Sequence, residues 1–280
     1  MENLESFYLI NLPLNKNKIP ELVAALKNSK IKKLGLINCF QKKDVLTSFI
    51  PYFSSSTNLQ EIDFSNHSFS IIPYLNNTLL NYNLNNNLTS INFSCCKLND
   101  EDITNISNYI VSSITILFCD ISKNILSTKA CSQFGFCISK TSSLETIKMN
   151  ECGINGESLL FLFNAKGSKS LKNIFLNGNN FGDIGLVSLN SFIKVSPLLE
   201  NIELKKCNGT DMGFTTLINT IKILQNIKLK SINYQGNNIT PISLGILRGS
   251  NEILKSKGII FILNKIEGED ISNINCAKFA

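Results

Sequence analysis

Few side chains in this sequence have the chemistry of catalysis or of metal and phosphate binding. The 280 residues include nine cysteines, a single histidine, His67, and a single arginine, Arg248. One histidine is too few for a multi-histidine metal site. His67 occupies a structural position in the repeat described below, so no histidine is left to serve as the base of a catalytic serine. Bidentate recognition of phosphates and bases relies mostly on arginine, and the lysines behind the net charge of +6 are scattered. We therefore predict no catalytic residue, no cofactor and no nucleic-acid partner.

These residues are embedded in a repeated pattern. Leu171–Phe181 has apolar residues at relative positions 1, 4, 6 and 11 and Asn at position 9, which is the spacing L-x-x-L-x-L-x-x-N-x-L. The first apolar position recurs every 27 to 30 residues, so nine units fill the chain. The units begin at Leu4, Ile31, Leu59, Leu88, Ile116, Leu144, Leu171, Leu199 and Leu229.

Each unit predicts a short strand followed by a helix. Positions 3 to 7 alternate apolar and polar residues, and apolar residues beyond position 11 recur at helical spacing. We expect helices to be capped by leading residues such as Asp100, Asp183, Asp211 and Thr240. Repeated β-α units give a parallel sheet with helices outside it. The sequence predicts a right-handed α/β solenoid, a horseshoe with a concave sheet and convex helices, as one domain over 1–280 with a cap at 258–280.

Position 9 alternates between Cys and Asn and places the cysteines. From the second unit onward it reads Cys39, His67, Cys96, Asn124, Cys152, Asn179, Cys207 and Asn237. A side-chain amide there can satisfy buried backbone groups of the turn, and His67 is expected to replace one such amide. Alternate cysteines would lie ~10 Å apart along parallel strands, too far to share a metal through bonds of ~2.3 Å. We predict core thiols, no metal site and no disulfide framework, with Cys95 as the exposed exception.

This pattern resembles the leucine-rich-repeat superfamily. The period near 28 with a helical return, and the Cys and Asn alternation, resemble the ribonuclease-inhibitor-like subclass, whose members include ribonuclease inhibitor, tropomodulin, CARMIL-type regulators and the GTPase activator of Ran. The resemblance implies a scaffold for binding proteins. The Ran activator carries a catalytic-site arginine early in its array, whereas no arginine precedes Arg248 here, so that activity is not implied.

Solvent-facing positions 3, 5, 7 and 8 predict a continuous surface on the concave side. Most of these residues are small and polar, but Phe118 and Phe175 are aromatic and stand two units apart, within roughly 12 Å by strand spacing. Aromatic anchors with charges around them are typical of protein-binding hot spots, although a composition-biased surface can also expose aromatic residues without a function. The predicted protein-binding residues are Phe118, Asp120, Lys148, Phe175, Glu203 and Lys205.

The expected function is a non-catalytic protein-interaction scaffold, as in cytoskeletal or signalling regulators. The alternatives are a regulator of a small GTPase and an enzyme inhibitor of the ribonuclease-inhibitor-like type. The amino terminus lacks the basic and apolar segments of a signal peptide, and no apolar run approaches the ~20 residues of a membrane span. We therefore expect a cytoplasmic, monomeric protein with one unidentified protein partner and no membrane contact.

Overall fold

The structure is a computed structural model that describes residues 4–81, 87–163, 166–225 and 227–280. It divides into two compact units. The first runs to Ile125 and includes Thr141–Leu144, and the second comprises Leu126–Lys140 and Glu145–Ala280.

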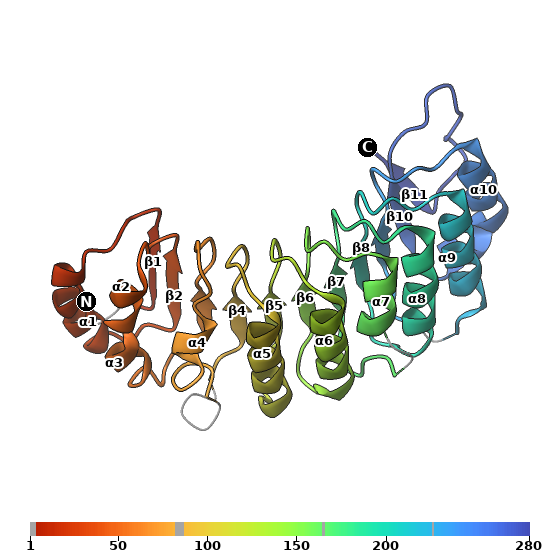
Figure 1. The fold of residues 1–280 in the computed structure, drawn as a ribbon. Coiled ribbons are helices and arrows are strands. Elements are labelled where there is room, and N and C mark those ends of the chain that lie inside the picture. Colours follow the sequence, from red (N-terminus) through yellow and green to blue (C-terminus); the bar gives the residue numbers. More distant parts are fainter. Residues whose placement is uncertain (1–3, 82–86, 164–165, 226) are drawn as a thin grey trace. The chain divides into compact units, whose positions relative to one another are not determined.

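The first unit contains parallel strands that lie side by side in chain order. The residues at repeat positions 3, 4 and 5 are in register from strand to strand, so that Leu34 lies opposite Ile62 and Ile62 lies opposite Ile91. Helices follow the strands on one face of this sheet (Figure 1). The strands are β1 (Ser6–Ile10), β2 (Lys33–Ile37), β3 (Glu61–Asp63), β4 (Ser90–Asn92) and β5 (Phe118–Asp120). The helices are η1 (Lys16–Lys18), α1 (Ile19–Lys27), α2 (Lys43–Thr47), α3 (Ile50–Phe53), α4 (Ile72–Leu75) and α5 (Asp100–Ser112).

The second unit repeats this arrangement. Its strands are again parallel and follow chain order, and α6, α8 and α9 are each 13 residues long. The strands are β6 (Thr146–Lys148), β7 (Asn173–Phe175), β8 (Asn201–Glu203), β9 (Ser231–Asn233), β10 (Ile260–Leu263) and β11 (Ala277–Phe279). The helices are α6 (Thr128–Lys140), α7 (Gly156–Leu162), α8 (Gly182–Lys194), α9 (Asp211–Ile223) and α10 (Pro241–Ser256).

The repeat positions explain which side chains form the core. Leu88 and Leu144 are fully buried and Leu199 is 2% exposed, as equivalent first positions should be. Strands from β3 to β8 bury their central residue between the sheet and the helices and leave positions 3 and 5 half-buried on the other face. We call this other face, formed by positions 3, 5 and 7, the open sheet face. The predicted α/β leucine-rich-repeat solenoid is confirmed.

The helix starts differ in part from those predicted. Asn99, one residue before Asp100, caps α5 and forms a capping box with Asp102. Asp183 lies in the first turn of α8, and Asp211 lies in the first turn of α9. A carboxylate in the first turn still interacts favourably with the amino end of the helix, so the pattern identified the right turn but the wrong residue.

Two of these first-turn carboxylates bind the helix of the following repeat. Asp183 accepts hydrogen bonds from the Thr210 N–H at 2.8 Å and from its hydroxyl at 2.6 Å, and Thr210 is the N-cap of α9. Asp211 accepts the same pair of bonds from Thr240, at 2.8 and 2.6 Å. Thr240 is the N-cap of α10, as predicted, and Pro241 lies in the first turn of that helix. These contacts link each helix to the N-cap of the next.

The segment after Gly268 closes the last repeat. It ends in β11, which pairs in parallel with β10. Arg248 holds the segment through Glu269 at 3.2 Å, and the Asn251 Oδ1 accepts hydrogen bonds from the N–H groups of Asn275 and Cys276, at 2.9 and 3.1 Å. Cys276 is 1% exposed, so the segment covers the core at this end.

Candidate protein-binding surface on the sheet

The strands that carry the open sheet face are tied together beneath it by the side chains at position 9. Asn179 is the clearest case, since its Oδ1 accepts hydrogen bonds from the N–H groups of Cys152 at 2.9 Å and Ile154 at 3.1 Å. Its Nδ2 donates to the carbonyl oxygens of Met149 at 2.7 Å and Leu176 at 2.8 Å. Asn124 and Asn237 make the equivalent bonds.

His67 fills the same role with its ring. Its Nε2 accepts from the Cys39 N–H at 3.3 Å, its Nδ1 lies 2.9 Å from the Phe64 carbonyl oxygen, and the ring stacks on Phe40. Both bonds are satisfied by a neutral ring with its proton on Nδ1. Burial lowers the pKa of His67, which keeps the ring neutral. The predicted structural role of His67 is confirmed.

The cysteines at position 9 lie in the interior and donate to carbonyl oxygens. The Sγ atoms of Cys96 and Cys207 lie 3.0 and 3.3 Å from the carbonyl oxygens of Phe64 and Leu176. Burial raises the pKa of both thiols to about 12, so they stay protonated at neutral pH. Cys95 is exposed, as predicted, and every other cysteine is buried. Within the described ranges, no group of three His, Cys, Asp or Glu side chains could hold a metal ion.

A feature that the sequence analysis missed lies at position 8, where each chain leaves its strand. All nine units have a positive φ there, between 51° and 72°. Glycine tolerates this left-handed conformation without strain, and Asn tolerates it better than most other residues. Five of the nine units carry Asn or Gly at this position, which was the available signal. The residues are Asn11, Asn38, Asn66, Cys95, Lys123, Glu151, Gly178, Lys206 and Gly236.

Phe118 and Asp120 lie on the open sheet face of the first unit. Both are half-buried on β5, so Phe118 is less exposed than predicted. The carboxylate of Asp120 accepts a hydrogen bond from the Ser122 N–H at 2.9 Å. Adjacent side chains on a sheet shield each other, which the sequence pattern alone cannot show.

On the second unit, one row of the open sheet face is a chain of side-chain hydrogen bonds across four strands. Asn173 donates to the Thr146 hydroxyl at 3.0 Å, and Asn201 donates to the Asn173 Oδ1 at 2.7 Å. Ser231 then donates to the Asn201 Oδ1 at 2.7 Å. These position-3 side chains are therefore held in one arrangement.

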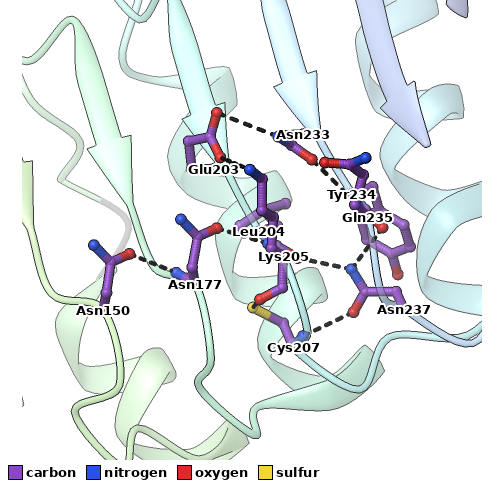
Figure 2. A network of polar contacts seen from close by, with 10 residues as sticks. All are labelled: Asn150, Asn177, Glu203, Leu204, Lys205, Cys207, Asn233, Tyr234, Gln235 and Asn237. Carbon is purple, nitrogen blue, oxygen red and sulfur yellow. Dashed lines mark hydrogen bonds and ion pairs between the residues drawn. The ribbon is translucent and has the colours of Figure 1, made fainter. Parts of the chain in front are cut away.

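A second row runs along position 7 and binds backbone groups. Asn150 Oδ1 accepts from the Asn177 N–H at 2.8 Å, and Asn177 Oδ1 accepts from the Lys205 N–H at 2.7 Å (Figure 2). Sequence reasoning placed these residues on the surface without assigning them this function. The alternation of small polar residues was consistent with it but did not identify it.

Between these rows lie Lys148, Phe175 and Glu203 at position 5, with Lys205 at position 7 beside them. The Lys148 ammonium is 5.3 Å from the centre of the Phe175 ring, a cation–π contact. Glu203 lies 3.9 Å from the Lys205 ammonium and 3.5 Å from the Asn233 amide (Figure 2). Phe175 is half-buried rather than fully exposed, because Lys148 extends over it. We call Lys148, Phe175, Glu203 and Lys205 the Phe175 patch.

The six predicted site residues therefore fall into two groups. Four of them form the Phe175 patch on neighbouring strands of the second unit, and Phe118 and Asp120 belong to the first unit. Asn233, which is 4% exposed, lies beneath the Phe175 patch and contacts Glu203, and the sequence analysis did not select it.

Comparison with known proteins identifies the fold. A chain of the Rad7 and Elc1 complex from yeast matches with a TM-score of 0.65 and 14% identity over 99% of this chain and 67% of that one. The leucine-rich repeat-containing protein LegL7 from Legionella pneumophila matches with a TM-score of 0.58 and 15% identity over 97% of this chain and 86% of that one. No protein-family model and no curated protein sequence matches.

The fold that this chain shares with these structures is the leucine-rich-repeat solenoid, in agreement with its nine sequence repeats. The fold alone specifies neither a function nor a partner. None of the helices in the described part of the chain has the length and apolar character of a membrane span.

Proposed function

We propose that this chain is a non-catalytic scaffold that binds a protein partner through its open sheet face, with the Phe175 patch as the main contact. Phe118 and Asp120 of the first unit are proposed as further contact residues. The observation that carries the proposal is the side-chain order of the second unit, where two rows of hydrogen bonds flank an aromatic ring and charges of both signs.

Order of this kind favours binding because less rotamer freedom remains to be lost. Asn173, Asn177 and Asn201 are already held by their neighbours. The Phe175 ring offers apolar area at the centre of the patch, and Lys148, Glu203 and Lys205 can pair with charges of either sign. A partner that displaces Lys148 from the ring would cover Phe175 and gain a contact of the hot-spot type.

The comparisons support a role in protein interaction by analogy of fold, since one similar chain was solved in a protein complex. We also propose that the chain belongs to the ribonuclease-inhibitor-like subclass, that its repeats form one domain and that it acts in the cytoplasm. The repeat of 27 to 30 residues with helices of 13 residues supports the subclass.

Affinity capture from native cytosol tests the patch with a matched pair of variants. Phe175→Ala removes the ring under Lys148. Phe136→Ala removes an equivalent ring from the helix face, where the Lys140 ammonium is 5.7 Å from the ring centre and Phe136 is 49% exposed. We expect Phe175→Ala to weaken partner binding by about 2 kcal/mol, roughly 30-fold in Kd.

Phe136→Ala should capture the same proteins as the parent, and both variants should melt near the parent temperature. Equal capture by the parent and Phe175→Ala would refute the patch. Loss of capture by both variants would show that the contact is not specific to the sheet face. A nucleotide-hydrolysis assay on any captured GTPase separates the scaffold from a GTPase regulator, because the scaffold leaves the rate unchanged.

A further inference from the structure

The first and last strands of the repeat array differ in how their outer edges are protected. β11 is three residues long with the exposed Lys278 at its centre, and short charged strands resist pairing with other chains. β1 is five residues long, Ser-Phe-Tyr-Leu-Ile, and contains no charge, proline or glycine. Its composition favours strand pairing. Only β1 therefore has the character of a strand that accepts another strand.

Among the described residues, the outer edge of β1 presents its backbone groups without a partner. The Glu5 carbonyl oxygen accepts from the Lys33 N–H at 3.0 Å, and the Asn11 N–H donates to the Ile37 carbonyl at 2.9 Å, so the odd-numbered residues at both ends face β2. Because backbone direction alternates along a strand, Ser6, Tyr8 and Ile10 direct their N–H and C=O groups outward. In the part of the chain that is described, β1 pairs with β2 alone.

The side chains at this end of the first unit are also incompletely covered. Phe7 and Leu9 are half-buried, whereas Leu34 and Leu36, their equivalents in β2, are fully buried. Tyr8 does not shield the edge, because its ring lies over β2, where a Cβ on Gly35 would collide with its Cδ1 atom. Ile10 and Leu12 are 59% and 53% exposed. Half-open core positions thus lie beside an open backbone edge.

We propose that a second copy of this chain pairs with β1 in antiparallel fashion, around a twofold axis at Tyr8. In this register Tyr8 lies opposite Tyr8 of the second copy, and Ser6 lies opposite Ile10 of the second copy. These residues are the ones whose N–H and C=O groups face outward, so each pair exchanges backbone hydrogen bonds. The proposal replaces the monomer expected from the sequence and does not depend on the Phe175 patch.

The choice of a second copy over another partner rests on self-complementarity. The outward-facing residues are symmetric about Tyr8, which an isologous interface requires. Phe7 lies opposite Leu9 of the second copy, so the half-buried apolar side chains of each copy are covered by those of the other. Glu5 lies opposite Asn11 of the second copy, and no like charges meet within the strands. A closed pair also consumes both exposed edges, so the contact does not propagate into a filament.

Light scattering coupled to size exclusion tests the proposal on the full chain. The parent is expected at twice 31.1 kDa at micromolar concentration. Tyr8→Pro removes an outward N–H that makes no hydrogen bond to any described residue, and should give 31.1 kDa with an unchanged circular dichroism spectrum. The control Tyr8→Thr keeps the N–H and the strand preference, and should remain dimeric.

Two charge variants keep the test valid if the proline variant fails to fold. Tyr8→Lys and Tyr8→Glu each place like charges on the axis and should be monomeric, whereas an equal mixture should form a dimer. In hydrogen exchange, the amides of Ser6, Tyr8 and Ile10 should be protected in the parent and exposed in the monomeric variants. The Phe7 amide faces β2 and should be protected in all of them.

A parent at 31.1 kDa throughout this range would overturn the proposal. So would a dimer that survives Tyr8→Pro, or charge variants that do not recombine. A monomeric parent that instead binds an added strand peptide at β1 would show that the edge serves a different protein, and would likewise reject the second copy.

Discussion

Replacing Asn179 measures how much the row of buried Asn and His side chains at position 9, here called the amide ladder, contributes to the fold. Asn179 is fully buried, and Asn179→Ala leaves the N–H groups of Cys152 and Ile154 without their acceptor. Each buried N–H that loses its partner costs about 1–3 kcal/mol. The carbonyl oxygens of Met149 and Leu176 lose a donor as well, and water entering the vacated space offsets part of the total. We expect a loss of about 3 kcal/mol in the free energy of unfolding.

Urea unfolding followed by circular dichroism is the assay. A loss of this size corresponds to a fall in Tm of roughly 6–12 °C for a chain of this length. The control is the exposed neighbour Asn180→Ala, which should stay within about 0.5 kcal/mol of the parent. Asn179→Cys should recover little, because a thiol can donate to the carbonyls but is a weak acceptor for the two N–H groups. An Asn179→Ala variant as stable as Asn180→Ala would refute the account of the ladder.

Three further predictions concern single side chains. His67→Asn should keep the stability of the parent at pH 7.5 and should lose less stability than the parent on acidification. Burial lowers the pKa of His67 below its unfolded value, so the stabilisation by the neutral ring is present above about pH 6.5 and is lost as the pH falls through the folded pKa. Urea unfolding at pH 7.5 and 5.5 would detect the difference. Cys95 should be the one thiol of nine that reacts rapidly with a maleimide in the native protein, and Cys95→Ser should abolish that fast reaction. Asn251→Ala should release the segment after Gly268, because the N–H groups of Asn275 and Cys276 lose their acceptor. Limited proteolysis should then show faster cleavage in this segment. An unchanged cleavage rate would contradict the role assigned to Asn251.

The sequence predicted those features that follow from the repeat period itself. Leu88, Leu144 and Leu199 are equivalent core residues, because the first position of every unit lies at the same place in the core. His67 could be placed in the ladder because position 9 is otherwise Cys or Asn from the second unit onward. Thr240 before Pro241 identified a helix start, since both residues have a strong positional preference.

Features that depend on contacts between units were not predictable in the same way. Asp183 resembles an N-cap within its own unit, yet its carboxylate binds Thr210 of the next. Phe175 is half-buried because a lysine from the preceding strand extends over it. β11 was missed because its pairing with β10 is set by the path of the intervening cap, and a three-residue strand leaves no periodic signal.

The ladder has a consequence for how such a chain can lengthen or shorten. Each Asn or His at position 9 serves the cysteine unit before it, as Asn179 serves Cys152 and Asn237 serves Cys207. Excising residues 171–198 would bring Cys152 next to Cys207, where no amide remains to accept the two N–H groups. Excising residues 144–198 would instead bring Asn124 next to Cys207 and preserve the alternation. Duplications and losses that survive in descendants of this gene should therefore come two units at a time.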